Sequence, residues 1–383
     1  MLLWLAYALA IFWTWQAVSN LPSLLIVAYL PESLSQQGAK APPAVTIIVA
    51  ACDEEETIVQ TLEQLASQTY PNCAIVAIND RSTDHTGERM REVAARRSQI
   101  RVVDIEALPH GWLGKNHALY TGAMHAQSEW LLFTDADVIF EPSAVARMVT
   151  YARANMTDHL VVTPQIDAPS LTLKALIAFF LLNFTLAFRP QKVSNPRSRA
   201  FIGMGACNFV RRSAYESVGG HEAIKRRPDE DIRLGQRLKR AGFRQAFCPA
   251  RHFARVRWYP SVSAMARGLE KNTLALFLYS PSLLMTAMIP YALVYVGPFA
   301  ELFWLRGATE WLAVYTACLT AMLYLASLRF TDYSRWLVLT LPFAASLFGG
   351  ILVRAALLTG YRGGIDWRGT FYPLSELRRK GDS

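Results

Sequence analysis

Apolar and polar positions divide the chain into an apolar beginning, a mixed middle and an apolar end. Residues 1–31 contain no charged side chain, and Leu2 to Val18 is long enough to cross a bilayer once. The segment has neither a basic start nor a clear small-residue cleavage site, so we expect a retained anchor and not a cleaved signal peptide. From Ser282 the chain is again mostly apolar, and we expect three spans there: Leu283 to Leu305, Trp311 to Leu328 and Trp336 to Leu358.

The middle of the chain alternates short apolar runs with amphipathic stretches. Four of the runs are typical of buried strands: Val45 to Ala50, Ala74 to Ile78, Ile100 to Val103 and Trp130 to Phe133. Strands that alternate with helices predict a doubly wound, mostly parallel α/β sheet. The predicted organisation is an anchor (1–31), a linker (32–42), an α/β domain (43–272), transmembrane helices (273–360) and a basic tail (361–383).

One hydrophobic run lies inside the predicted α/β domain. Leu171 to Phe188 carries Lys174 as its one charged residue and is long enough to span a membrane. Its position in the middle of the domain favours a helix that lies in the membrane interface or packs against the domain.

The stretch from Leu274 to Leu305 does not fit a simple span. Its 32 residues include Pro281 and Pro290, and it is longer than the roughly 20 residues of one crossing but short for two. A re-entrant or interfacial turn there would give an even number of crossings. The basic tail would then lie in the cytosol, as the positive-inside rule requires.

Composition places the chain between soluble and membrane proteins. It is 52% hydrophobic and 18% charged, with a mean hydropathy of +0.18, which fits a soluble domain with membrane segments attached. The five cysteines form no C-x-x-C pair and have no disulfide-like spacing, so we expect free thiols in a reducing compartment.

Positive charge is concentrated in one part of the chain. The net charge is +9, and residues 189–257 hold 17 Lys and Arg against 5 Asp and Glu. Such a segment predicts anionic partners, either phospholipid headgroups or a pyrophosphate. A nucleic acid is the other possible partner of a basic patch, but the sequence contains no recognisable nucleic-acid-binding module, and we expect none to bind.

Two carboxylates follow the fourth predicted strand. Asp135 and Asp137 are two residues apart, and at the end of an extended strand they lie on one side. Hard oxygen donors at the carboxyl edge of an α/β sheet suit Mg²⁺ or Mn²⁺ that carries a substrate phosphate. The alternative is a capped turn before a helix that begins near Pro142.

Three further motifs have both a structural and a functional interpretation. Lys115 follows a glycine-rich turn that opens a helix, which is either an anion site or a surface charge. Asp53 can act as an N-cap, with Glu56 completing a capping box. Asp231 can also be an N-cap, but three consecutive acids in the most basic part of the chain point to a catalytic or metal-linked carboxylate.

Together these motifs resemble those of family 2 glycosyltransferases, which have the GT-A fold. The resemblance runs from about Pro43 to Asn272 and includes the metal-binding D-x-D motif of the family. Three other motifs occur in the family's order: Ala51-Cys52-Asp53-Glu54 for the nucleotide turn, Asn79-Asp80-Arg81-Ser82 for the base-binding turn, and Glu230-Asp231 for the catalytic base. Asp53 replaces the usual Asn of the first motif, and Asn79 replaces the first Asp of the second.

More narrowly, two stretches are similar to hopanoid-associated and carotenoid-acid glycosyltransferases. These stretches run from Gly111 to Leu119 and from Tyr259 to Asn272. The Q-x-x-R-W motif of processive synthases is incomplete, because Arg257-Trp258 is present but Ala254 occupies the Gln position. This departure argues against a cellulose- or hyaluronan-like polymerase.

The resemblance implies inverting transfer of one sugar from a nucleotide sugar, with a UDP-sugar favoured, to a membrane lipid. It makes Asp137 the ligand of Mg²⁺ or Mn²⁺, with Asp135 between the metal and the ribose. Asp231, or else Glu230, becomes the general base. The donor-binding residues implied are Ala51, Asp53, Glu54, Asp80, Lys115 and Asp135, with Arg257 and Trp258 as further substrate contacts.

Other functions stay open at this point. One is a short processive polysaccharide synthase, and another is a non-catalytic membrane protein that binds a nucleotide sugar. We expect a multi-pass protein of a bacterial-type inner membrane, with its catalytic domain in the cytosol. No obligate protein partner is visible in the sequence.

Overall fold

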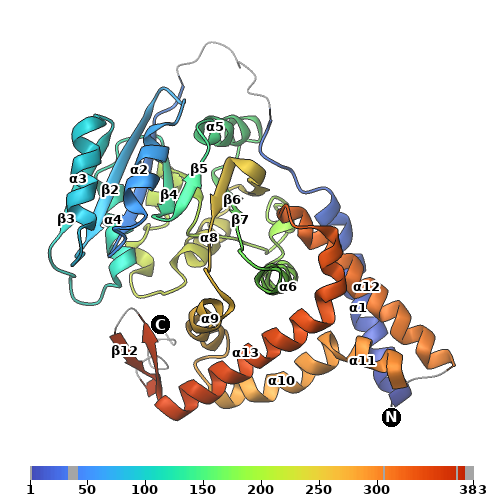
Figure 1. The fold of residues 1–383 in the computed structure, drawn as a ribbon. Helices are drawn as coiled ribbons and strands as arrows, with labels where there is room; N and C mark the ends of the chain where they lie inside the picture. Colours follow the sequence, from blue (N-terminus) through green and yellow to red (C-terminus); the bar gives the residue numbers. More distant parts are fainter. Residues whose placement is uncertain (1, 33–41, 305–306, 368–369, 376–383) are drawn as a thin grey trace. The chain divides into compact units, whose positions relative to one another are not determined.

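The computed structural model describes residues 2–32, 42–304, 307–367 and 370–375. The chain divides into two compact units (Figure 1). The α/β unit comprises Ile26–Asp167 and Phe188–Arg257, and the helical unit comprises Met1–Leu25, Ala168–Ala187 and Trp258–Ser383. We expected one α/β domain from residue 43 to residue 272. The helical unit instead includes Ala168–Ala187 and the residues after Arg257. The domain boundaries remain a prediction.

A seven-stranded sheet forms the centre of the α/β unit. Every neighbouring pair is parallel except those of β8, which runs antiparallel to both β4 and β6. The strand order is β3 (Ile100–Ile105), β2 (Cys73–Asp80), β1 (Val45–Ala51), β4 (Trp130–Asp135), β8 (Asn208–Arg211), β6 (His159–Thr163) and β9 (Gln245–Pro249). The predicted mostly parallel α/β sheet is therefore confirmed.

The sheet buries different side chains on its two faces. Successive residues of a strand point to opposite faces, and β4 follows this rule. Leu132 packs in one cluster with Leu62, and Phe133 packs in the other with Leu119 and Leu238. The helices of this unit are α2 (Ile58–Ala66), α3 (Thr86–Arg96), α4 (Gly114–Met124), α5 (Ala144–Ala154), α7 (Arg212–Ser217) and α8 (Glu230–Arg240).

A small second sheet completes the α/β unit. It consists of β5 (Val138–Phe140), β10 (Ala254–Val256) and β7 (Gln165–Ile166). Because β5 begins directly after Asp137, β4 and β5 fix both ends of the D-x-D turn.

The helical unit contains the apolar segments. Its helices are α1 (Leu2–Leu25), α6 (Leu171–Phe188), α9 (Val262–Leu276), α10 (Pro281–Tyr295), α11 (Gly297–Trp304), α12 (Ala308–Ser327) and α13 (Leu341–Arg362). The predicted basic tail begins in the last residues of α13, and its next described residues form the hairpin β11 (Gly364–Trp367) and β12 (Thr370–Pro373).

Three helices among the described residues are long and apolar enough to cross a membrane. They cover Leu171–Lys192, Thr309–Phe330 and Arg335–Arg362, and the last two contain two of the predicted spans. The third predicted span is instead a broken pair, α10 and α11, bent by 53°. α1 forms the expected uncharged helix but is not among the three, so its role as an anchor stays a prediction.

Candidate active site

The candidate site lies at the carboxyl ends of the central strands. In the β1–β4 ladder Asp135 pairs with Ala50, and in the β1–β2 ladder Ala51 pairs with Asn79. This strand register brings the carboxyl ends of β4, β1 and β2 to one edge of the sheet. Ligands of open α/β sheets usually bind at that edge.

Lys115 connects the D-x-D motif to the E-D motif. It is the second residue of α4, and its Nζ lies 2.7 Å from Asp135 Oδ1 and 3.0 Å from Glu230 Oε1. Burial opposes the charge of Lys115, but Asp135, Glu230 and Asp231 together raise its pKa well above the usual value. Three residues that we predicted from separate motifs therefore form one ion-pair cluster.

Glu230 is the buried member of this cluster. It is the first residue of α8 and is 6% exposed. Burial raises the pKa of Glu230, and the charges of Asp231 and Asp135 add to this effect, while Lys115 opposes it. Glu230 thus depends on Lys115 as its counter-ion.

Asp231 is held by backbone N–H groups. Its Oδ2 accepts a hydrogen bond from Gly205 N–H at 2.7 Å, and its Oδ1 accepts one from Ile232 N–H at 2.7 Å. The N-cap of α8 is Asp229, so the alternative interpretation of Asp231 as an N-cap is wrong. The carboxylate of Asp231 is oriented by these two donors.

Two glycines allow the chain before β8 to approach the ion-pair cluster and α8 closely. A methyl group added at Gly205 would lie 2.8 Å from Lys115 Nζ and 3.0 Å from Asp135 Oδ2. A methyl group at Gly203 would lie 1.7 Å from the Asp231 carbonyl oxygen. Gly205 was not among the residues predicted for the site, although the two glycines around Met204 were a signal for a close backbone approach.

Asp137 experiences an excess of negative charge. Its side chain is open to solvent on one side, and the protein that surrounds the rest of it raises its pKa to about 6 by burial. The carboxylates of Asp135 and Glu54 raise the pKa further. Lys115 lowers the pKa only in part. A bound cation would relieve this repulsion.

The described residues contain no group of three or more His, Cys, Asp or Glu side chains that could hold a metal ion. Asp135 and Asp137 alone fit a different kind of site. Mg²⁺ is commonly held by one or two carboxylates together with the phosphates of the substrate. The donor set therefore fits an ion that arrives with a diphosphate, and not one enclosed by protein ligands.

Hydrogen bonds connect the turn after β1 to the turn after β2. Asp53 Oδ1 accepts a hydrogen bond from Thr83 N–H at 2.7 Å, and Glu54 N–H donates to Thr86 Oγ1 at 2.8 Å. Asp53 has a left-handed φ of 54°, and the N-cap of α2 is Thr57. The interpretation of Asp53 as an N-cap is wrong, because the N-cap of α2 lies four residues further along the chain.

Asp80 is buried and paired with its neighbour Arg81. Arg81 Nε lies 2.7 Å from Asp80 Oδ1, and Asp80 is 4% exposed. A methyl group at Gly114 would lie 2.7 Å from Asp80 Oδ2, so α4 begins directly beside this carboxylate. The turn after β2 and the start of α4 are therefore neighbours.

Arg257 and Trp258 fall in different compact units. Arg257 is exposed at the end of the α/β unit. Trp258 belongs to the helical unit, where its ring packs against Phe180 with centroids 4.8 Å apart. Their predicted contacts with substrate remain a prediction.

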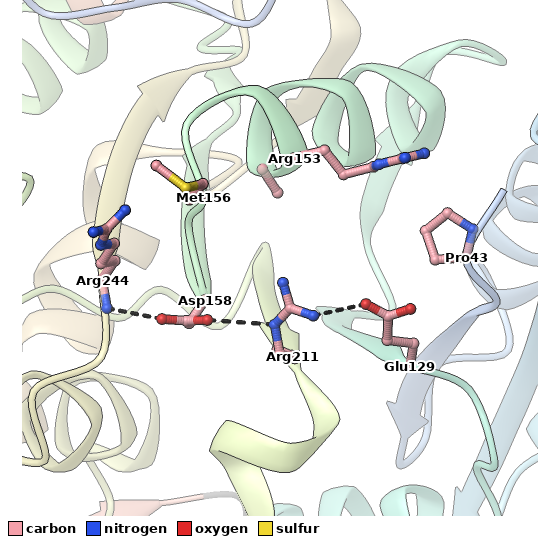
Figure 2. Close-up of a pocket in the computed structure, with 8 residues that line it drawn as sticks. Pro43, Glu129, Arg153, Met156, Asp158, Arg211 and Arg244 are labelled. Atoms are coloured by element: carbon pink, nitrogen blue, oxygen red, sulfur yellow. Dashed lines mark hydrogen bonds and ion pairs between the residues drawn. The ribbon is translucent and has the colours of Figure 1, made fainter. Parts of the chain in front are cut away.

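A cavity of about 570 Å³ lies at the opposite ends of the strands (Figure 2). It is lined by residues that precede β4, β6 and β9, among them Glu129, Asp158 and Arg244. Arg211 lies between the two carboxylates, 2.7 Å from Glu129 Oε1 and 3.3 Å from Asp158 Oδ1. The lining of this cavity carries three arginines against two carboxylates, and none of the predicted site residues lines it.

Residues 46–219 match the family model described as Glycosyl transferase family 2. This part of the chain is a family 2 glycosyltransferase domain. The match contains Lys115, Asp135, Asp137 and Gly205 and ends before Glu230.

Two known proteins show the extent of the similarity. The 4,4'-diaponeurosporenoate glycosyltransferase of Staphylococcus aureus strain USA300 is 24% identical over 344 residues, which cover 87% of this chain and 89% of that protein. The mannosyltransferase PcManGT of Pyrobaculum calidifontis, solved in complex with GDP-Man and Mn²⁺, has a TM-score of 0.55 at 18% identity. That likeness covers 94% of this chain and 99% of the other, and it shows that the glycosyltransferase has the GT-A fold.

Proposed function

We propose that this glycosyltransferase transfers a single sugar, with inversion, from a nucleotide sugar to a membrane lipid. The observation that carries the proposal is the cluster in which Lys115 joins Asp135 of the D-x-D motif to Glu230 of the E-D motif. It brings the residues expected to bind the donor close to those expected to activate the acceptor.

Asp231 acts as the general base in this proposal. It takes the proton of the acceptor hydroxyl group as that oxygen attacks the anomeric carbon, and the nucleoside diphosphate leaves from the opposite face. One displacement inverts the anomeric centre, so no nucleophile of the enzyme is required. The N–H groups of Gly205 and Ile232 fix the direction of the carboxylate.

Asp137 and Asp135 would hold Mg²⁺ or Mn²⁺, which supplies positive charge that neutralises the departing diphosphate. The ammonium of Lys115 stabilises the same leaving group and keeps its charge because its pKa is raised. The turns at Asp53 and Asp80 border the same edge of the sheet, where the nucleoside would bind. A UDP-sugar is the favoured donor.

The acceptor is proposed to be a lipid for two reasons. Among its described residues, the helical unit holds three helices long and apolar enough to cross a membrane. The relative from S. aureus is named for a carotenoid-type acceptor, diaponeurosporenoate. The enzyme would act at the inner membrane of a bacterium with its α/β unit in the cytosol, and its basic residues 189–257 would face anionic headgroups.

A donor panel tests the proposal. Purified full-length protein is incubated with UDP- and GDP-sugars, a membrane-lipid extract and Mg²⁺ or Mn²⁺, and the released nucleotide is measured. We expect lipid-dependent release from one class of donor. A protein that only binds nucleotide sugars would release nothing from any donor, and that result would overturn the proposal.

A further inference from the structure

A buried hydrogen-bond network lies behind the Asp231 carboxylate and has no part in the mechanism above. His159, Gln245 and Asn208 are 0%, 2% and 3% exposed. They come from β6, β9 and β8, the three adjacent strands at one side of the sheet. Buried polar groups are costly unless they are paired, so the bonds they make indicate what they hold.

The imidazole of His159 lies between the other two side chains. Gln245 Nε2 lies 2.9 Å from His159 Nδ1, and His159 Nε2 lies 3.0 Å from Asn208 Oδ1. Burial lowers the pKa of His159 to about 4, so the ring is neutral at neutral pH. A neutral ring has one acceptor for the Gln245 amide and one donor for the Asn208 oxygen.

Both partners of His159 bind the chain segment from Ile202 to Gly205. Gln245 Oε1 accepts a hydrogen bond from Ile202 N–H at 3.3 Å, and Asn208 Oδ1 accepts a long one from Met204 N–H at 3.4 Å. Gln245 Nε2 also donates to the Gly235 carbonyl of α8 at 2.6 Å. The network therefore joins the 202–205 segment to the body of α8.

The same segment supplies the donor to the proposed general base. Gly205 N–H donates to Asp231 Oδ2 at 2.7 Å, and a methyl group at Gly235 would lie 1.8 Å from the Ile202 carbonyl oxygen. The segment is thus in backbone contact with α8 and leaves little space for a shift. A displacement of the segment would move the Gly205 donor away from Asp231.

We propose that His159 is a positioning residue: through Gln245 and Asn208 it holds the 202–205 segment so that Gly205 N–H orients the Asp231 carboxylate. This inference rests on the proposed role of Asp231 as the general base. His159 does not contact the substrate, and it acts on the reaction only through the backbone of Gly205.

Kinetics of full-length variants test the inference. His159→Leu removes both bonds, and we expect kcat to fall about 10- to 100-fold with KM for the donor changed less than about twofold, because misplaced catalytic groups cost turnover more than binding. His159→Gln should restore most of kcat, because its amide can donate to Asn208 and accept from Gln245. His221→Leu is the matched control: His221 is 1% exposed but bonds to Tyr215, and its loss should lower Tm with kcat retained.

Hydrogen exchange provides a second readout that needs no activity. In the wild type, the hydrogen-bonded amides of Ile202, Met204 and Gly205 should be protected like those of β8, and His159→Leu should increase their exchange. Fast exchange of these amides in the wild type would overturn the inference, even if His159→Leu does not fold. An unchanged kcat in His159→Leu, or an equal loss in His159→Gln, would also overturn it. Absence of transfer by the wild type would instead contradict the proposed function, while exchange would still test the positioning role.

Discussion

The ammonium of Lys115 lies 2.7 Å from a carboxylate oxygen of Asp135. The pair joins the start of α4 to the end of β4 across the carboxyl edge of the sheet. Because the same ammonium also lies 3.0 Å from Glu230, it balances charge on two motifs that are far apart in the sequence. Its removal should therefore affect both stability and transfer.

Lys115→Gln should lower the free energy of unfolding by about 2 kcal/mol, because it leaves the buried Glu230 without its counter-ion. The loss is smaller than for an enclosed ion pair because the Lys115 side chain is one-third exposed. Transfer should fall about 10²–10³-fold through loss of the charge that stabilises the leaving group. Arg212→Gln is the control, because its exposed pair with Glu216 should contribute less than about 1 kcal/mol. Equal effects of the two substitutions on stability and transfer would contradict this role.

The raised pKa of Asp137 predicts a pH dependence of metal binding. The carboxylate must be ionised to bind a cation, so the concentration of Mn²⁺ that gives half-maximal turnover should rise as the pH falls through about 6. A pH profile measured at several Mn²⁺ concentrations tests this. A half-maximal concentration that stays constant between pH 5 and 7 would contradict it.

The same pKa predicts how stability changes with pH when no metal is added. Between about pH 4 and pH 6 the folded protein binds the Asp137 proton more tightly than the unfolded chain, so this group's contribution to stability falls as pH rises through that window. Asp137→Asn removes the contribution. In EDTA, Tm of the wild type relative to Asp137→Asn should therefore decrease from pH 4 to pH 7, and parallel curves would refute the assignment.

Asp231→Asn distinguishes a general base from a structural carboxylate. We expect kcat to fall about 10²–10⁴-fold, with donor binding largely retained. The amide oxygen can still accept from Gly205 N–H, but the bond from Ile232 N–H is lost, so Tm should fall slightly. A drop in Tm with kcat preserved would mean that Asp231 serves only to fix the start of α8.

The bend between α10 and α11 bears on membrane topology. A pair of helices bent by 53° is either one broken span or a re-entrant loop, and a re-entrant loop would leave two candidate crossings after it, those of α12 and α13. We predict a cytosolic C-terminus. Ser383 lies outside the described residues, and Ser383→Cys labelled in intact cells with a membrane-impermeant thiol reagent tests the prediction, with the wild type labelled in parallel. Additional labelling of the variant would place the tail outside the cell.

The four adjacent parallel strands β3, β2, β1 and β4 could be predicted from the sequence because each contains an apolar run, whereas the parallel pair β6 and β9 was not predicted. Val45 to Ala50 and Trp130 to Phe133 are such runs, and the structure places β1 and β4 over them. The antiparallel β8 could not be predicted in this way. It is only four residues long, and its place between β4 and β6 depends on the chain connections.

The element ends that carry several candidate site residues were predictable from the sequence, but Gly205 and the arrangement of these residues were not. Periodicity and spacing placed Asp135, Lys115 and Glu230 at the ends of elements, which is a local property. The ion pairs among them depend on how α4 and α8 pack, which no local pattern specifies. The N-cap interpretation of Asp53 failed for a related reason, because its side chain accepts from Thr83 in another turn.

The most direct test of the proposed reaction is mass spectrometry of the lipid products. Full-length wild type and Asp137→Asn are incubated with the accepted donor and a membrane-lipid extract, with Mg²⁺ or Mn²⁺ or with EDTA. Our account predicts that the wild type adds one sugar to each acceptor lipid only with the metal, and that Asp137→Asn, whose amide is a poor substitute for an anionic ligand, adds none. A ladder of added sugars, or equal products from Asp137→Asn in EDTA, would contradict it.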